Sequence, residues 1–366
     1  MMRIVLAPDS FKGTITAADA ASALAVGWGD GPDFVMRPMA DGGEGTVAAF
    51  AAAVPGAARM PVTVDGPAGA PVDTSWLLLP PTADAPDGTA VIDLASTSGI
   101  ELLSELRPLD ADSTGFGQAI ATALDHGVSR LVLGIGSSAS TDGGTGMLRA
   151  LGARFADAAG SEVPAGARGL LAIATADLTG LRSAPETLVL TDVTNPLTGP
   201  RGAAEVFGPQ KGLTDPADRA RTDAGLAALA VLLGLDPSTP GAGAAGGVGG
   251  ALVAWGARLL PGASEVARLI GLAEAIADAD LVVTGEGSYD GQSGDGKVPS
   301  FVAGLAADAG VPAVVVAGRI TADADASIFS TAVSLTELAG SSEAALGDPA
   351  RWLRNAGAQL SSRFER

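Results

Sequence analysis

Only three of the 22 cationic side chains in this chain are lysines, and each lysine is directly beside a glycine. The three are Lys12, Lys211 and Lys297. A lysine ammonium is a compact, rotatable charge, and a neighbouring glycine lets backbone N–H groups come close to a ligand. This pattern favours the binding of phosphate or carboxylate groups. The alternative is that three lysines remain by chance in a chain rich in alanine, arginine and glycine.

Composition restricts the class of protein. The net charge is −19 without any basic run, which argues against nucleic acid or an anionic membrane as a partner. The 366 residues fit two or three domains, and the absence of cysteine excludes disulfides and a thiolate nucleophile. The longest uncharged apolar stretch, residues 225–235, is too short for a bilayer, and residues 1–10 do not resemble a secretory signal. We therefore expect a cytoplasmic protein.

The single histidine, His126, precedes Gly127 at the end of a predicted helix. We expect its imidazolium to stabilise the helix C-terminus by complementing the helix dipole, and Gly127 to supply a left-handed cap. A histidine-dependent triad and a multi-histidine metal site are therefore excluded. General acid–base chemistry must fall to a carboxylate.

Short runs rich in β-branched residues alternate with alanine-rich stretches, which is typical of parallel α/β sheets. Residues 61–64 and 72–79 flank a turn and predict an antiparallel pair that interrupts this pattern. We predict a discontinuous Rossmann- or flavodoxin-like domain, residues 1–60 plus 270–366, with a mixed-sheet α/β domain, residues 61–269, inserted into it. The other predicted strands are residues 4–7, 34–39, 90–94, 131–135, 188–190, 281–283, 313–317 and 332–334.

The discontinuous domain is expected to have the strand order 2-1-3-4-5, in which ligands bind where the winding direction reverses. The loops after its first and third strands would then meet. Residues 291–297 match the front of a phosphate loop, but Val298 replaces the Ser or Thr of a Walker A motif, and Pro299 opens the following helix. An ordinary turn is the alternative. The residues of the two loops that could do chemistry are Asp9, Ser10, Lys12, Gly285, Glu286, Gly287, Asp290 and Lys297.

The segment Gly134-Ile-Gly136-Ser-Ser138-Ala139 follows a predicted strand and matches the dinucleotide pattern G-x-G-x-x-A. It supports a rival interpretation, an NAD(P)-dependent oxidoreductase acting on a small hydroxy acid. Gly143 and Gly144, however, prolong the loop where the helix of such a motif would begin. A second glycine-rich segment, residues 240–247, follows a turn and is expected to open a helix.

Two pairs of polar residues follow predicted strands. Asp41 and Glu44 suit Mg²⁺, which takes a few carboxylate oxygens together with phosphate and water, or they cap a helix with Glu44 at its third position. Asp192 and Asn195 are placed to handle a hydroxyl or a metal, or they form an Asx turn before Pro196.

Seven motifs follow one another along the chain. They are Ala7-Pro-Asp-Ser-Phe-Lys-Gly13, Ala40-Asp-Gly-Gly-Glu-Gly-Thr46, Gly134-Ile-Gly136 through Asp142-Gly-Gly144, Asp192-Val-Thr-Asn-Pro-Leu197, Phe207-Gly-Pro-Gln-Lys-Gly212, Pro240-Gly-Ala-Gly-Ala-Ala-Gly-Gly247, and Thr284-Gly-Glu-Gly287 with Gly296-Lys-Val-Pro299. Together these motifs resemble the bacterial type 1 glycerate kinase family across essentially the whole chain. The chain departs from the family pattern at Ser137, where a third glycine is usual, and at Thr141, where asparagine is common.

The resemblance implies Mg²⁺-dependent transfer of the γ-phosphoryl group of ATP to D-glycerate, in a cleft between two α/β domains, giving 2-phosphoglycerate rather than 3-phosphoglycerate. The expected partners are ATP and D-glycerate, with no nucleic acid and no membrane, and a homodimer is compatible with the sequence. A protein that binds glycerate or nucleotide without turnover is the third alternative.

Phosphoryl transfer depends on positioning and charge neutralisation, which lysines, magnesium and glycine-loop N–H groups supply. We expect the lysines to hold phosphate oxygens or the glycerate carboxylate, and Asp192 to orient or deprotonate the attacking hydroxyl. The expected residues are Asp192, Lys12 and Lys211 for catalysis; Gly285, Gly287, Lys297, Gly134, Gly136 and Ser138 for the nucleotide; Asp9, Ser10, Asn195 and Asp290 for the substrate; and Asp41 and Glu44 for the metal.

Overall fold

The computed structural model describes residues 1–11, 13–291 and 297–364, and the chain divides into two compact units. Unit 1 comprises Met1–Asp41, Ala48–Pro55 and Ala263–Arg366, and unit 2 comprises Gly42–Val47 and Gly56–Gly262. The sequence placed the boundaries near residues 60 and 270. It did not anticipate that a short segment before residue 48 belongs with unit 2.

Unit 1 contains a five-stranded parallel sheet in the order β13-β12-β11-β1-β2. Taken from the other edge, this is the predicted order 2-1-3-4-5, which is therefore confirmed. The central strands consist largely of buried Val, Leu and Ile, as expected of a parallel sheet covered on both faces. The elements of unit 1 are β1 (Arg3–Pro8), α1 (Ala17–Trp28), β2 (Asp33–Met36), α11 (Leu272–Ala277), β11 (Leu281–Tyr289), α12 (Val298–Asp308), β12 (Ala313–Ile320), β13 (Thr331–Ser334), α13 (Leu335–Ala339), α14 (Ser342–Gly347) and α15 (Pro349–Phe364). Two helices, α2 (Thr46–Ala53) and α10 (Gly262–Leu269), cross a unit boundary.

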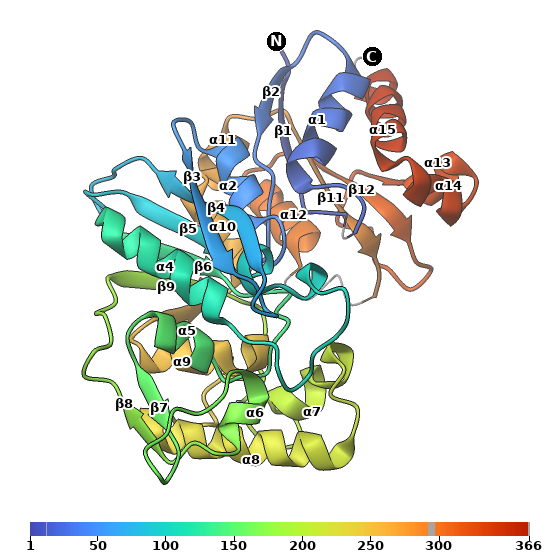
Figure 1. Cartoon of the computed structure of the whole chain (residues 1–366). Coiled ribbons are helices and arrows are strands. Elements are labelled where there is room, and N and C mark those ends of the chain that lie inside the picture. Colours follow the sequence, from blue (N-terminus) through green and yellow to red (C-terminus); the bar gives the residue numbers. More distant parts are fainter. Residues whose placement is uncertain (12, 292–296, 365–366) are drawn as a thin grey trace. The chain divides into compact units, whose positions relative to one another are not determined.

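Helices α1 and α15 lie side by side in unit 1, as Figure 1 shows. Side chains cap the start of α1: Asp19 N donates to Thr16 Oγ1 at 3.1 Å, and Thr16 Oγ1 donates to the Asp19 carboxylate at 2.7 Å. The two helix backbones come close at glycines. A Cβ on Gly27 would lie 1.9 Å from Arg354 O, and one on Gly357 would lie 2.3 Å from Leu24 O. Glycine at these positions therefore sets the spacing of the helix pair.

Three predicted strand ends in unit 1 were wrong, and one of them is that of β12, which continues to Ile320 instead of ending at residue 317. β11 does not end at residue 283 but continues to Tyr289, so Gly285 and Gly287 are strand residues and not loop residues. The small size of Gly285 lets β12 approach, because a Cβ at this position would lie 2.1 Å from Val316 O. β2 ends at Met36, three residues early.

Unit 2 contains a six-stranded mixed sheet in the order β10-β9-β6-β5-β4-β3. The predicted antiparallel pair is confirmed as β3 and β4, β4 also runs antiparallel to β5, and the remaining pairs are parallel. Its elements are β3 (Ala58–Asp65), β4 (Pro71–Leu79), β5 (Thr89–Asp93), α3 (Ala95–Ser98), η1 (Ile100–Leu102), α4 (Thr114–His126), β6 (Arg130–Gly134), α5 (Thr145–Ala150), β7 (Arg154–Ala156), α6 (Gly166–Leu170), β8 (Thr175–Asp177), β9 (Glu186–Leu190), α7 (Ala203–Phe207), η2 (Pro209–Lys211), α8 (Pro216–Leu233), η3 (Ala244–Gly247), α9 (Val248–Ala254) and β10 (Arg258–Leu260). The short strands β7, β8 and β10 were not predicted.

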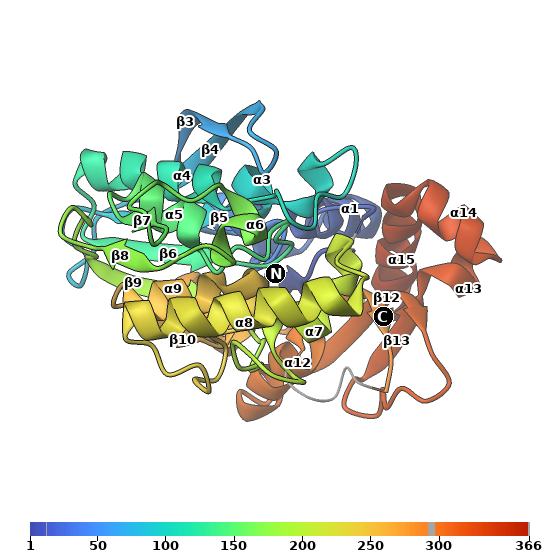
Figure 2. The ribbon, with the colours of Figure 1, turned by 60° about the horizontal axis from the view of Figure 1, so that its bottom comes forward.

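The core of unit 2 joins one face of this sheet to α4, α5, α8 and α9. Helix α8 packs against α6 and α7, and Figure 2 shows it running past both. The predicted end of α4 is confirmed, because His126 is its last residue and Gly127 is left-handed with φ of 89°. Among the described residues, no helix is both long and apolar enough to cross a bilayer.

We expect Gly357→Ala to lower the free energy of unfolding by about 2 kcal/mol, because the added methyl group would meet the α1 backbone. Gly304→Ala is the matched control, since Gly304 lies in α12 with nothing within 4 Å of the added Cβ. The control should raise stability by about 1 kcal/mol through helix propensity. Urea unfolding followed by circular dichroism measures both variants. Equal effects of the two substitutions would contradict the close packing of α1 and α15.

Candidate active site

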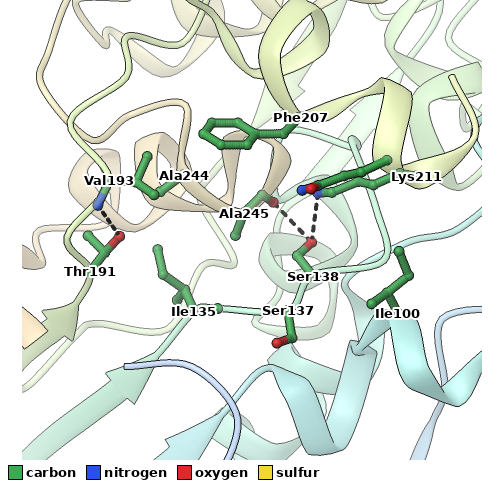
Figure 3. A pocket seen from close by; sticks show the side chains of 12 residues that line it. Ile100, Ile135, Ser137, Ser138, Thr191, Val193, Phe207, Lys211, Ala244 and Ala245 are labelled. Carbon is green, nitrogen blue, oxygen red and sulfur yellow. Dashed lines mark hydrogen bonds between the residues drawn. The ribbon is translucent and has the colours of Figure 1, made fainter. Parts of the chain in front are cut away.

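Lys211 lines a cavity of about 370 Å³ in unit 2, a volume suited to a small organic molecule. The wall is formed by the loop after β6, the segment after β9, the α7–η2 segment and η3. Figure 3 shows the side chains of Lys211 and Ser138 pointing toward one another, while Ser137 points away from them. The predicted residues Gly136, Ser138 and Lys211 therefore share one cavity.

The Lys211 ammonium is buried and is held by neutral acceptors. Its side chain is 3 % exposed, and Nζ donates to Ser140 O at 2.5 Å and to Ser138 Oγ at 3.3 Å. No carboxylate in the described part of the chain lies within ion-pair distance of Nζ. Burial lowers the pKa of Lys211 to about 8, and the charge of Asp142 opposes that shift. An ammonium has three donors, so the two observed bonds leave one for a ligand.

Close backbone contacts between glycine-rich loops shape this region of unit 2. Gly136 N donates to Gly42 O at 3.0 Å, and a Cβ on Gly136 would lie 2.5 Å from Gly43 Cα. Gly246 makes a similar contact, because its Cβ would lie 2.1 Å from Ser140 O. Motifs that are far apart in the sequence thus meet through their main chains.

Two residues at the cavity have left-handed backbone conformations that are unusual for side chains with a Cβ. Ser137 has φ of 59° and Ala245 has φ of 54°, and within the described ranges these are the non-glycine residues with positive φ. Both line the cavity, and Ala245 O accepts a hydrogen bond from Ser138 Oγ at 3.2 Å. Such strain concentrates at functional sites. The left-handed conformation also explains why glycine suits position 137.

The loop after β6 differs from a dinucleotide motif. β6 ends at Gly134, and the next helix, α5, begins only at Thr145. A dinucleotide motif needs a helix N-terminus directly at its glycines to bind the pyrophosphate. This geometry removes the main support for the oxidoreductase interpretation.

The two residues predicted after β9 are placed differently. Asp192 is exposed, lies between the cavity residues Thr191 and Val193, and accepts a hydrogen bond from Gly262 N at 2.8 Å. Asn195 is outside the cavity lining, and its Nδ2 donates to Arg201 O at 2.8 Å.

The helix-capping alternative for Asp41 and Glu44 was wrong, because α2 begins at Thr46. Gly42 has φ of 94°, which is outside the right-handed helical region, so no helix starts at Asp41. A Cβ at Gly42 would lie 2.3 Å from Leu190 O, so this position also has no room for a larger residue. Glu44 is exposed and Asp41 is half-buried. No group of three or more potential metal-binding side chains occurs in residues 1–11, 13–291 and 297–364.

The predicted residues of unit 1 lie near the end of β1 and along β11. Asp9 N donates to Gly285 O at 2.8 Å, which continues the pairing of β1 with β11, and Ser10 N donates to Asp9 Oδ1 at 2.7 Å. The expected meeting of the loops that follow these two strands stays a prediction. Lys297 forms an ion pair with Asp290 at 3.2 Å at the N-terminal end of α12, whose first turn contains Pro299. Lys12 and residues 292–296 of the predicted phosphate loop lie outside the described residues.

Several cavity residues were not predicted from the sequence, namely Thr191, Phe207 and Ala245. Each lies in or next to a motif named in the sequence analysis, and this position is the sequence feature that could have identified it as a cavity residue. Asp142 was also not assigned a role, although it is fully buried. Its surroundings depend on contacts between distant segments that the sequence alone does not reveal.

We expect Ser137→Gly to raise the free energy of unfolding by about 0.5–1 kcal/mol, because glycine adopts the left-handed conformation without a steric penalty. Ser161→Gly is the matched control, since Ser161 is an exposed loop serine of unit 2 without positive φ. That change should lower stability by a similar amount. Urea unfolding compares the two, and destabilisation by Ser137→Gly would count against strain at this position.

Comparison with known proteins identifies relatives along nearly the full chain. A model of the glycerate kinase family matches residues 4–365. Glycerate 2-kinase of Escherichia coli (strain K12) is 41% identical over 381 residues, covering 98% of both chains. Glycerate kinase of Bacillus subtilis (strain 168) is also 41% identical, covering 89% of this chain and 87% of that protein.

The fold agrees with a solved structure. A crystal structure described as that of a glycerate kinase 2 from Salmonella typhimurium LT2 matches with a TM-score of 0.84 and 38% identity, covering 100% of this chain and 98% of that one. The predicted α/β fold class, with a parallel sheet and a separate mixed sheet, is confirmed. The chain belongs to the glycerate kinase family.

Proposed function

We propose that this protein is an ATP-dependent glycerate kinase that transfers the γ-phosphoryl group to D-glycerate and forms 2-phosphoglycerate rather than 3-phosphoglycerate. Family membership over residues 4–365 and the relative named glycerate 2-kinase support the proposal. The observation that carries it in the molecule is the buried Lys211 ammonium in a cavity lined by family motifs.

The Lys211 cavity suits an anionic small molecule. Phosphoryl transfer depends on holding charged groups in place and neutralising charge, and little covalent help is required. A buried ammonium with one remaining donor binds a carboxylate or phosphate oxygen more strongly than an exposed lysine does, because water competes less. We propose that Lys211 holds such an oxygen and that Asp192 orients or deprotonates the attacking hydroxyl.

The remaining assignments continue as proposals within each unit. In unit 2, Gly134, Gly136 and Ser138 would contribute to nucleotide binding, and Asn195 to substrate binding. The corresponding residues of unit 1 are Gly285, Gly287 and Lys297 for the nucleotide, Asp9, Ser10 and Asp290 for the substrate, and Lys12 for catalysis.

Magnesium is the expected metal, and Asp41 and Glu44 are the proposed ligands. The pair supplies carboxylate oxygens, which Mg²⁺ prefers, and Mg²⁺ commonly takes only one or two carboxylates beside water and substrate phosphate. The position of Glu44 on an exposed turn, outside any helix, is compatible with such a ligand. Bound magnesium would neutralise charge on the phosphates of ATP.

We expect a new phosphomonoester when the purified protein is incubated with ATP, Mg²⁺ and D-glycerate. Phosphorus NMR, with authentic 2- and 3-phosphoglycerate added as references, identifies the product and its position in one spectrum. A signal whose chemical shift coincides with that of authentic 2-phosphoglycerate supports the full proposal. A signal at 3-phosphoglycerate would correct the position, whereas unchanged ATP with folded protein would contradict the kinase activity.

We expect kcat/KM for D-glycerate to fall as the pH rises through about 8, because Lys211 is charged below that pH and neutral above it. Binding to the free enzyme requires the ammonium, so the decline should approach tenfold for each pH unit. Lys211→Arg is the diagnostic variant, since a guanidinium stays protonated throughout this range. Initial rates between pH 6.5 and 9.5 measure the profile. An unchanged decline in Lys211→Arg would assign it to another group.

A further inference from the structure

Asp142 is a fully buried carboxylate that is satisfied entirely by uncharged donors. Oδ2 accepts hydrogen bonds from Ser113 Oγ at 2.7 Å, Ser113 N at 3.1 Å and Gly146 N at 3.1 Å. Oδ1 accepts from Ser140 Oγ at 2.9 Å and Gly144 N at 3.2 Å. Both carboxylate oxygens therefore have hydrogen-bond partners, as buried polar groups require.

Ser140 links this carboxylate to the cavity lysine. Its hydroxyl donates to Asp142 Oδ1, and its carbonyl accepts from Lys211 Nζ at 2.5 Å. The hydrogen bond to Asp142 fixes the side chain of Ser140, and the backbone contact with Gly246 confines its carbonyl. The direction of the ammonium therefore follows from groups that Asp142 helps to hold.

The indirect arrangement has an electrostatic consequence. A direct ion pair would use ammonium donors and cancel much of the local field, leaving less for a ligand. Here Asp142 acts on Lys211 at longer range. Its negative charge raises the pKa of Lys211 and so opposes the lowering that burial causes. The lysine thus keeps a counter-charge while one donor stays available to the cavity.

Two other charged groups, Asp112 and Arg149, interact electrostatically in the surroundings of Asp142. Asp112 is half-buried, and burial together with the charge of Asp142 raises its pKa to about 6. The positive charge of Arg149 lowers the pKa of Asp112, and Arg149 Nε lies 4.0 Å from the carboxylate of Glu162. Of the charged groups in the described residues, Asp142 is the one whose charge raises the pKa of Lys211.

We propose that Asp142 is a positioning residue of the Lys211 cavity, which orients the ammonium through Ser140 and places a buried negative charge near it. Its importance for turnover rests on the proposed function. The orientation and charge of Lys211 are properties of the folded protein and can be measured without substrate.

Three lysines make a direct titration practical. In protein labelled with ¹³C at the lysine ε-carbon, each lysine gives one NMR signal, and Lys211→Met identifies the signal of Lys211 by its loss. In the unaltered protein this signal should titrate near pH 8. In Asp142→Asn the midpoint should fall by about one pH unit or more, because the opposing charge is gone.

The direction of the shift separates the proposal from a purely structural role. If Asp142 only maintains the fold, its loss would admit water, and the midpoint would rise toward the ordinary lysine value of 10.5. A rise, or no shift in folded Asp142→Asn, would overturn the proposal. A downward shift in a protein that makes no phosphoglycerate would support the role of Asp142 while the proposed function fails.

A second pair of variants keeps the proposal testable if Asp142→Asn does not fold. Ser140→Ala removes the hydroxyl that links Asp142 to the lysine acceptor, and Ser113→Ala removes a hydroxyl bond to the same carboxylate on its other oxygen. Ser140→Ala should change the Lys211 chemical shift and lower kcat/KM at least tenfold, while Ser113→Ala should stay within threefold. Equal effects of the two variants on both readouts would contradict the link through Ser140.

Discussion

The cavity of unit 2 depends on loop backbones that touch without any Cβ between them. A Cβ on Gly136 or on Gly246 would lie closer than 3 Å to backbone atoms of Gly43 or Ser140. Real Cβ atoms essentially never come that close, so larger residues would force the loops apart. Ser140 is also the residue whose carbonyl holds Lys211. The contact that joins two distant motifs therefore also fixes the place of the cation.

A buried cation without an ion pair is poorly explained by stability alone. Desolvation of an ammonium costs several kcal/mol, and hydrogen bonds to a carbonyl and a hydroxyl compensate for only part of this. An apolar side chain would serve the fold better at position 211. Two strained backbone positions, Ser137 and Ala245, occur at the same cavity. Unfavourable features gathered in one place indicate a region shaped for binding or chemistry.

The sequence predicted the arrangement of strands better than the details of the loops. The strands of the parallel sheet were predicted from short runs of β-branched residues, which depend on local burial, and their order from the alternation of these runs with helical stretches, as in flavodoxin-like sheets. Gly285 and Gly287 were taken as loop residues because glycine usually marks turns, yet here β12 packs closely against that strand. Lys211 was recognised because lysine is rare in this chain. The role proposed for Asp142 was not recognisable from the sequence. One of its donors, Ser113, lies 29 residues away along the chain, and only folding brings the two residues together.

The strongly negative charge of the whole chain affects how the one lysine of unit 2, Lys211, could bind an anion. A net charge of −19 disfavours the approach of an anionic substrate at long range, although salt screens this repulsion beyond about 8 Å at physiological ionic strength. Under the proposed function, capture of the anionic substrate would therefore depend on short-range contacts. A buried ammonium provides such a contact, because low local polarity strengthens its attraction while the surface charges are screened. The acidic surface and the isolated cation are thus compatible, since each acts over a different distance.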